Sequence, residues 1–393
     1  MHPTFHRLIF WGHLIIGIIA GLVILSMAIS GLMIAYEVQL MDWANRDFRV
    51  SPPAENATRL GIENLLVRGR EIQPGQVPSG ITWKADPALP VTVTFGREGI
   101  HYLDPYTGKD LGSGAKAWHD FFHATTDWHR FLTQTGLERP IGKAITGAGT
   151  LLFGLLLVSG IYLWWPRHWR VANLKAALLF NLKLKGRSRD WNWHNVIGFW
   201  SAFPMLLIIL TGLIMSYGWA NNLLFRLTGN EPPPPRSSPP AMAAGEARRG
   251  PPGGEQRREN PPAQPLPNLT GLDSLLAQVQ ETHPGWRSIS LRMSQAPGGP
   301  LPLMLDRGGR GQPHLRTMLN LDLGKQAILP SPDDFQQQNL GRRLRMFARF
   351  LHTGELFGFL GQTLAALCTL AAILLVWTGF ALAWRRFFNK KQV

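Results

Sequence analysis

The stretch "ISGLMIAY" at residues 29–36 recurs as "LTGLIMSY" at residues 210–217, and this repetition decides the fold. Both copies end a long apolar segment, and both carry a Ser/Thr-Gly dipeptide followed by a tyrosine, Tyr36 or Tyr217. A match of this kind far apart in one chain indicates an internal duplication.

The match extends backwards along both segments. His13-x3-Gly17 aligns with His194-x3-Gly198 at the same offset as the opening pair. In a helix the 17 residues from His13 to Ser30 would cover about 25 Å. Each copy therefore places a histidine near one end of an apolar helix and a small polar residue near the other.

Four segments are long and almost free of charge, and each reaches the ~20 apolar residues that a bilayer-spanning helix requires. They cover about Leu8–Tyr36, Ala144–Trp165, Trp193–Trp219 and Phe357–Trp384. The first is too long for the apolar core of a signal peptide and lacks a small-x-small cleavage site before Tyr36, so we expect it to be retained. The predicted fold class is an α-helical integral membrane protein whose four transmembrane helices form a tandem duplication.

The formal charge of +15 is concentrated beside these segments. The loop at 166–190 and the tail after residue 384 are rich in Lys and Arg, and short basic loops stay in the cytoplasm. Both termini are then cytoplasmic, and the segments 37–143 and 220–356 are exported. Nucleic-acid binding is the other interpretation of a basic chain, but this charge follows the membrane topology.

The second and fourth spans also match, as "SGIYLWWPR" (159–167) and "TGFALAWRR" (378–386). Outside the membrane, the units that start at Gly61 and Gly271 each predict a short helix ending in Pro-Gly, followed by strand-like runs. We therefore expect one helix and a small antiparallel sheet per copy. The Pro/Gly-rich segment 231–267 has no core-forming residues and is predicted to be a disordered linker.

The predicted organisation has eleven consecutive parts. They are span 1–36, external module 37–117, His-rich interfacial helix 118–142, span 143–166, basic cytoplasmic loop 167–190, span 191–219, linker 231–267, external module 268–335, His-bearing interfacial helix 340–359, span 360–384 and basic tail 385–393.

Histidine is uncommon inside a membrane span and usually marks function there. His13 and His194 sit at matching depth on duplicated spans, which favours two imidazoles facing each other as axial ligands of a b-type haem. Gly17 and Gly198, one turn away, would make room for the macrocycle. Packing of helices is the alternative explanation of these small residues.

A second set of histidines precedes the second and fourth spans. "WHDFFHATTDWHRFL" (118–132) carries His119, His123 and His129, and "RFLHTGELFGFLG" (349–361) carries His352. The duplication relates His129 to His352, so this pair is predicted to hold a second haem, with His123 as the substitute for His129.

Several other interpretations of these residues stay open. His119 and His123 share a helix face next to Asp120 and could hold zinc, although "HDFFH" is not the H-E-x-x-H pattern of zinc hydrolases. Three arginines near the ligand regions could pair with haem propionates or simply extend to the membrane interface: Arg7, Arg130 and Arg349.

The remaining histidines have no partner at related positions and are treated as surface or interface residues: His2, His6, His101, His168, His283 and His314. The single cysteine, Cys368, excludes an internal disulfide, a cysteine-ligated iron–sulfur cluster and covalent C-x-x-C-H haem attachment.

In combination these motifs resemble the PepSY-associated transmembrane family of iron-regulated membrane proteins. The resemblance is carried by the His13-x3-Gly17 span, "HRFLTQTG" at 129–136, "SGIYLWWPR", "HTGELFG" at 352–358 and the two external units, which look like PepSY modules. Within the family the chain is most similar to the haem-containing siderophore-iron reductases of the bacterial inner membrane, such as the ferrioxamine reductase. This likeness implies two haem b groups per chain and a ferric siderophore, of hydroxamate type, as the substrate.

The resulting hypothesis is a di-haem reductase that moves electrons from the cytoplasmic side to the siderophore in the periplasm, reducing Fe(III) to Fe(II). The sequence has no Gly-rich dinucleotide fingerprint after a strand on the cytoplasmic side, so a separate donor protein or quinol would supply electrons. A siderophore or metal permease, and a PepSY-type regulatory or sensor protein, are the alternatives.

Overall fold

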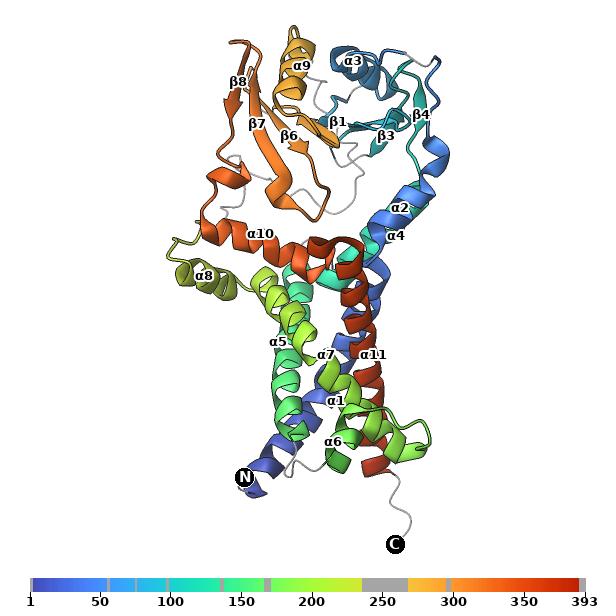
Figure 1. Ribbon diagram of the computed structural model, residues 1–393, viewed down its shortest axis with the longest axis vertical. Coiled ribbons are helices and arrows are strands. Elements are labelled where there is room, and N and C mark those ends of the chain that lie inside the picture. Colours follow the sequence, from blue (N-terminus) through green and yellow to red (C-terminus); the bar gives the residue numbers. More distant parts are fainter. Residues whose placement is uncertain are drawn as a thin grey trace, which may run out of the picture.

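The computed structural model describes residues 3–54, 57–74, 76–96, 99–134, 138–165, 171–234, 268–294 and 298–388. A bundle of long helices forms one part of the protein and a β-sheet domain forms the other, with α4 (Lys116–Phe131) and α10 (Leu340–His352) between them (Figure 1). α1 begins and α11 ends at the end of the bundle away from the sheet, which we call the terminal end; the other is the sheet end. The predicted linker 231–267 lies outside the described residues apart from positions 231–234.

Four helical segments are long and apolar enough to cross a membrane. They are α1 (Pro3–Ile34), α5 (Arg139–Trp164), α7 (Gly186–Ser216) and Glu355–Phe387, which contains α11 (Gly358–Phe387). Between 17% and 39% of their most apolar windows is buried inside the protein, so most of these residues keep some surface that the rest of the protein does not cover. A helix satisfies its own backbone hydrogen bonds, and such a surface is stable in lipid. The protein is an α-helical membrane protein.

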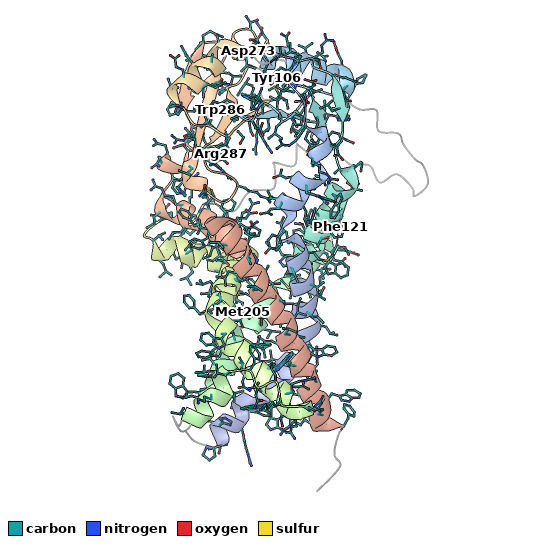
Figure 2. The ribbon with its side chains drawn as sticks, turned by 45° about the vertical axis from the view of Figure 1, so that its right-hand side comes forward. Tyr106, Phe121, Met205, Asp273, Trp286 and Arg287 are labelled. Atoms are coloured by element: carbon teal, nitrogen blue, oxygen red, sulfur yellow. The ribbon has the colours of Figure 1, made fainter. Side chains whose placement is uncertain are left out.

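Each long helix packs against two others. α1 contacts α5 and α11, and α7 contacts the same two helices, so α1 and α7 face each other diagonally across the bundle. Small residues allow these close approaches: a Cβ on Gly21 would lie 2.6 Å from Phe380, and one on Gly149 would lie 2.8 Å from Val23. Met205 lies in the middle of the bundle (Figure 2) and is buried in its apolar core.

The repeated octapeptide marks the place where a long helix ends and a short one starts. α1 ends at Ile34, and Tyr36 is the N-cap of α2 (Glu37–Ala44). In the other copy α7 ends at Ser216, and Tyr217 is the N-cap of α8 (Gly218–Leu227). The duplication is therefore visible in the structure as well as in the sequence.

The sheet has eight antiparallel strands in the order β4-β3-β2-β1-β5-β6-β7-β8. Each half follows one helix, α3 (Ile62–Ile72) or α9 (Leu272–Thr282). The strands of the first half are β1 (Gly80–Lys84), β2 (Val91–Thr94), β3 (Ile100–Leu103) and β4 (Asp110–Gly112). Those of the second half are β5 (Ser288–Arg292), β6 (Leu301–Asp306), β7 (Arg316–Asp322) and β8 (Ala327–Pro330).

The two halves form one continuous sheet instead of the two separate small sheets that the sequence predicts. β1 pairs with β5 along its whole length, with Ile81 opposite Leu291. Both side chains are buried in one apolar core shared by the two halves. Joining the sheets removes two exposed strand edges, which would otherwise be open to pairing with other chains.

The two helices of the sheet domain cap each other. Asp273 of α9 accepts hydrogen bonds from the backbone N–H of Ile62 (2.7 Å) and Glu63 (3.4 Å), at the start of α3. Glu63 in turn accepts one from the N–H of Asp273 (3.2 Å). Helix N-termini have unsatisfied N–H groups, and here each copy satisfies those of the other.

Three segments differ from the predicted boundaries. α4 (Lys116–Phe131) ends at a left-handed residue, Leu132, and α5 starts at Arg139 with Pro140 in its first turn, so the expected helix 118–142 is broken. α7 starts at Gly186, inside the expected basic loop, which also contains α6 (Val171–Leu178). The other short elements are η1 (Arg46–Phe48), η3 (Pro313–Leu315), η4 (Phe335–Gln337), α10 (Leu340–His352) and η5 (Glu355–Phe357).

Candidate metal-ligating histidine pairs

The first pair of histidines lies near the terminal end of the bundle. His13 of α1 and His194 of α7 belong to the two diagonally opposed helices. Their ring centres are 6.4 Å apart and the ring planes are nearly perpendicular, at 87°. We call this the inner pair.

The second pair lies at the sheet end and comes from the two shorter helices. His129 is in the last turn of α4 and His352 is the last residue of α10. Their ring centres are also 6.4 Å apart, with ring planes at 62°. Burial lowers the pKa of His129 to about 4, helped by the neighbouring His352, and burial also lowers the pKa of His352. We call this the outer pair. Both of its rings are therefore neutral imidazoles, the form that binds metals.

In the inner pair each Nδ1 contacts a hydroxyl group. His13 Nδ1 lies 2.9 Å from Ser159 Oγ, and His194 Nδ1 lies 2.9 Å from Thr378 Oγ1. These hydroxyls donate their hydrogen to the carbonyls of Leu155 and Leu374 (2.7 Å each). Because a hydroxyl has one hydrogen, it accepts from the imidazole, which places the proton on Nδ1 and leaves a lone pair on Nε2.

The outer pair has the same tautomer for a stronger reason. His129 Nδ1 lies 2.9 Å from the carbonyl of Met27, and His352 Nδ1 lies 2.9 Å from that of Ile208. A carbonyl accepts hydrogen bonds and cannot donate, so both rings are protonated at Nδ1. The hydroxyls of Ser30 and Thr211 lie further away, at 3.2 Å from the respective Nδ1.

A glycine beside each hydroxyl residue makes room for the imidazole. A Cβ on Gly31, Gly160, Gly212 or Gly379 would lie 3.2–3.6 Å from the Cε1 of the neighbouring histidine. A Ser/Thr-Gly dipeptide thus lies beside each of the four histidines. The sequence shows this dipeptide at matching positions of the duplicated helices. By itself, however, the dipeptide predicts only close packing of helices and not a contact with histidine.

The predicted role of Gly17 and Gly198, to make room for a macrocycle, stays a prediction. Their nearest neighbours are Leu156 and Leu375, and a Cβ would lie at ordinary contact distances of 3.8 and 3.6 Å. The glycines next to the inner histidines come from the adjacent helices: Gly160 of α5 lies beside His13, and Gly379 of α11 lies beside His194.

In both pairs the 6.4 Å between ring centres matches the spacing of two imidazoles that share one metal. Rings bound through Nε2 on opposite sides of one metal, with metal–nitrogen bonds of about 2.0 Å, have centres roughly 6 Å apart. Among the described residues there is no group of three or more His, Cys, Asp or Glu side chains that could hold a metal ion. Haem iron suits such two-ligand sites, since the porphyrin supplies the other four nitrogens.

The sequence matches the family described as the PepSY-associated TM region over residues 10–386. The chain belongs to the PepSY-associated TM family. The matched region runs from α1 to α11 and includes both histidine pairs. A comparison with curated proteins gives no match.

In this PepSY-associated TM protein His123 does not join the outer pair. It precedes His129 by about 1.7 helical turns, so the two side chains leave α4 in different directions. The His123 side chain is 70% exposed, and its Nδ1 lies 3.8 Å from Asp127. The structure therefore brings together His129 and His352, and leaves His123 at the surface.

The alternative zinc site at His119, His123 and Asp120 is not formed in the described part of the chain. The two histidine rings stack with centres 6.5 Å apart, and His119 Nδ1 lies 3.8 Å from Asp120. Asp120 is instead paired with Lys116, in keeping with an exposed helix face.

The three arginines suggested for propionate binding are all exposed. Arg130 lies over the Phe131 ring at 4.8 Å, and Arg349 lies over the Phe350 ring at 5.6 Å. Both contacts are the cation–π kind that positions an arginine beside an aromatic ring. Arg7 lies near the start of α1, at the terminal end.

The other histidines of this family member lie outside both pairs. His101 contacts Asp110 at 3.2 Å, His314 lies against Phe347, and His6 lies against Tyr162. His283 is in the turn after α9. His2 and His168 lie outside the described residues.

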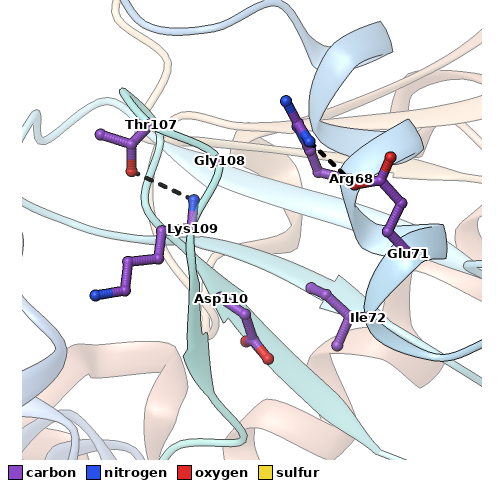
Figure 3. A pocket seen from close by; sticks show the side chains of 7 residues that line it. All are labelled: Arg68, Glu71, Ile72, Thr107, Gly108, Lys109 and Asp110. Atoms are coloured by element: carbon purple, nitrogen blue, oxygen red, sulfur yellow. Dashed lines mark hydrogen bonds and ion pairs between the residues drawn. The ribbon is translucent and has the colours of Figure 1, made fainter.

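A shallow pocket lies between α3 and the β3–β4 turn (Figure 3). Its polar lining includes the exposed ion pair of Arg68 with Glu71 (3.1 Å) and the turn residues Thr107 and Lys109. No histidine lines it, and it belongs to the sheet domain instead of the bundle. It is therefore separate from the two histidine pairs.

Proposed function

We propose that the protein is a di-haem b reductase of the bacterial inner membrane, which passes electrons from the cytoplasmic side to a periplasmic ferric siderophore. One observation carries this proposal: the same bundle holds two histidine pairs at different depths, both with ring centres 6.4 Å apart. In all four rings the described hydrogen bonds occupy Nδ1 and leave Nε2 for a metal.

His13 and His194 would hold one haem, and His129 and His352 would hold the other. When bound, haem supplies reversible one-electron exchange at its iron. The chain supplies neutral imidazoles in a fixed tautomer, and an apolar core around Met205 between the two pairs that excludes water.

The two pairs are spaced for transport of charge across a bilayer. His13 and Ser30, the neighbour of His129, are 17 residues apart on α1, and His194 and Thr211 are 17 residues apart on α7. This spacing corresponds to about 25 Å of helix, close to the ~30 Å of a hydrocarbon core. We therefore expect one site near each face of the membrane.

The proposed substrate is iron(III) bound by hydroxamate oxygens. Such hard ligands favour Fe(III), so adding one electron to give Fe(II) weakens the complex and releases the metal. The sheet domain would receive the siderophore on the periplasmic side. The electron donor would be quinol or a separate cytoplasmic protein, for which the basic segment around 167–190 offers a docking surface for an acidic partner.

An optical spectrum of the purified full chain tests the proposal. We expect a Soret band with sharp α and β bands on reduction, and bleaching of the reduced bands when ferric hydroxamate siderophore is added. Purified protein that stays colourless after expression with ample haem precursor contradicts it. That result would favour the permease or the PepSY-type sensor.

A further inference from the structure

The four histidines differ in what accepts the hydrogen bond from Nδ1–H. In the outer pair each Nδ1 has a backbone carbonyl at 2.9 Å in addition to a hydroxyl at 3.2 Å. For His13, the partner within the described part of the chain is the hydroxyl of Ser159, at 2.9 Å. A backbone carbonyl stays in place when a side chain is replaced. A hydroxyl belongs to the side chain and is lost when the serine is replaced by alanine.

We propose that Ser159 is a positioning residue for His13, and that its hydroxyl sets both the tautomer and the ligand strength of that imidazole. The carbonyl of Met27 performs this task for His129, so the hydroxyl of Ser30 is dispensable there. This inference rests on the proposed function, since it concerns the binding of haem iron by His13.

Ser159 can act as an acceptor because its own hydrogen is used elsewhere. Its Oγ donates to the carbonyl of Leu155 at 2.7 Å, one turn earlier in α5. Gly160 follows it, and a Cβ there would lie 3.4 Å from His13 Cε1. The ring is therefore seated against α5 with Nδ1–H directed at the hydroxyl. Without this acceptor a polar N–H would be left unpaired at membrane depth, which is costly.

The hydrogen bond also changes how strongly His13 binds iron. An acceptor on the distal N–H makes the imidazole a better donor through Nε2, and loss of such a partner typically weakens metal binding about 10- to 100-fold. Stronger donation stabilises the oxidised metal. Removing the hydroxyl therefore shifts the inner couple to a more positive potential and makes that haem easier to lose.

Ser30 is a matched control for Ser159. Both serines precede a glycine that contacts a histidine, and both donate to the carbonyl four residues earlier, at 2.8 Å for Ser30 and 2.7 Å for Ser159. Both lie in long apolar helices. The difference between them is the carbonyl of Met27, which lies 2.9 Å from His129 Nδ1.

The experiment compares Ser159→Ala, Ser159→Val, Ser159→Thr and Ser30→Ala in the full chain purified with its haem. Haem content is measured against protein, the two couples are resolved by a redox titration of the α band, and the ligand field is followed by EPR of the oxidised low-spin haem. Threonine and valine have nearly the same shape, so they differ at this position by the hydroxyl.

We expect Ser159→Ala and Ser159→Val to move one couple to a more positive potential, change its EPR signal and release that haem about 10-fold more readily. Ser159→Thr and Ser30→Ala should match the wild-type protein. Equal behaviour of the Thr and Val variants, or equal effects of Ser30→Ala and Ser159→Ala, would overturn the inference. A wild-type protein without haem would overturn the proposed function as well, whereas two haems that are unaffected by Ser159→Val would overturn the inference alone.

Discussion

His129 and His352 come from opposite halves of a duplicated chain, yet their ring centres lie 6.4 Å apart. Equivalent contacts position them: each Nδ1 donates to a backbone carbonyl of a long helix, that of Met27 in α1 or Ile208 in α7. The outer site is therefore built symmetrically by α4 on α1 and by α10 on α7.

This arrangement makes a prediction about His129. Replacing it with alanine should remove about one of the two haems, because bis-imidazole ligation needs both rings of a pair. His123→Ala is the matched control on the same helix, and its exposed side chain should be dispensable. The haem-to-protein ratio of the purified variants measures both effects. Loss of haem from the His123 variant together with retention in the His129 variant would show that the outer ligand was wrongly assigned.

The glycines beside the histidines give a second prediction. In Gly31→Ala the new methyl group would lie 3.2 Å from His129 Cε1, closer than ordinary van der Waals contact. We expect the ring to shift and haem at the outer site to be held about 10-fold less tightly. Haem transfer to apomyoglobin, followed by absorbance, measures this loss.

Gly17→Ala is the control for this variant, since the nearest side chain to its new methyl group would be Leu156, at 3.8 Å. Alanine is favoured over glycine in a helix by up to about 1 kcal/mol, so Gly17→Ala should keep both haems and gain slightly in stability. If both alanine variants retain haem equally, the fit of Gly31 against His129 is not required.

The spans and the histidine pairs could be predicted from the sequence because each corresponds to a pattern along the chain. Apolar length reveals a span, and the duplication relates His13 to His194 without any knowledge of contacts. The likeness between the two external units likewise predicts a helix and strands in each copy. These features depend on local sequence and on its repetition.

Other features depend on contacts between distant residues and could not be predicted in this way. The pairing of β1 with β5 unites two halves separated by a long stretch of chain, and no local pattern specifies which strand edges meet. Ser159 and Thr378 look like ordinary small residues of a helix interface until the rings of His13 and His194 are placed beside them.

The reciprocal caps of the sheet domain lead to a third prediction. Asp273→Ala removes the acceptor for the N–H of Ile62, and loss of such a cap costs about 1 kcal/mol. Hydrogen exchange of the full chain, read at the amides at the start of α3, should show faster exchange in this variant. Asp273→Asn keeps an acceptor and should protect these amides at least as well as the wild-type residue.

The contribution of Asp273 to the stability of the fold depends on pH, and the pKa of Asp273 determines the sign of this dependence. Burial raises the pKa of Asp273, with a smaller contribution from the nearby Glu63, so the folded state binds the proton more tightly than the unfolded chain. Protonation therefore stabilises the fold at low pH, and this contribution is lost as the pH rises through the folded pKa. The advantage of Asp273→Asn over the wild type should be greatest at neutral pH and shrink on acidification. An advantage that grows with acid contradicts the assignment.

The final prediction concerns the terminal end of the bundle, where Asp190 joins α7 to α11. Asp190 is 3% exposed and forms ion pairs with Arg189 (2.9 Å) and Arg385 (3.1 Å). Asp190→Ala leaves Arg385 without this partner, and we expect a loss of about 1–3 kcal/mol in the free energy of unfolding. Thermal unfolding in detergent, followed by circular dichroism, gives the ranking of variants.

Arg189→Ala is the matched control for Asp190→Ala, because the Arg189 side chain is 46% exposed and its removal leaves Asp190 paired with Arg385, so we expect a smaller loss of stability. Asp190 also lies one turn before His194, so loosening α7 from α11 there should release haem from the inner site before the outer one. If Arg189→Ala destabilises the protein as much as Asp190→Ala, the buried carboxylate is not what holds these two helices together.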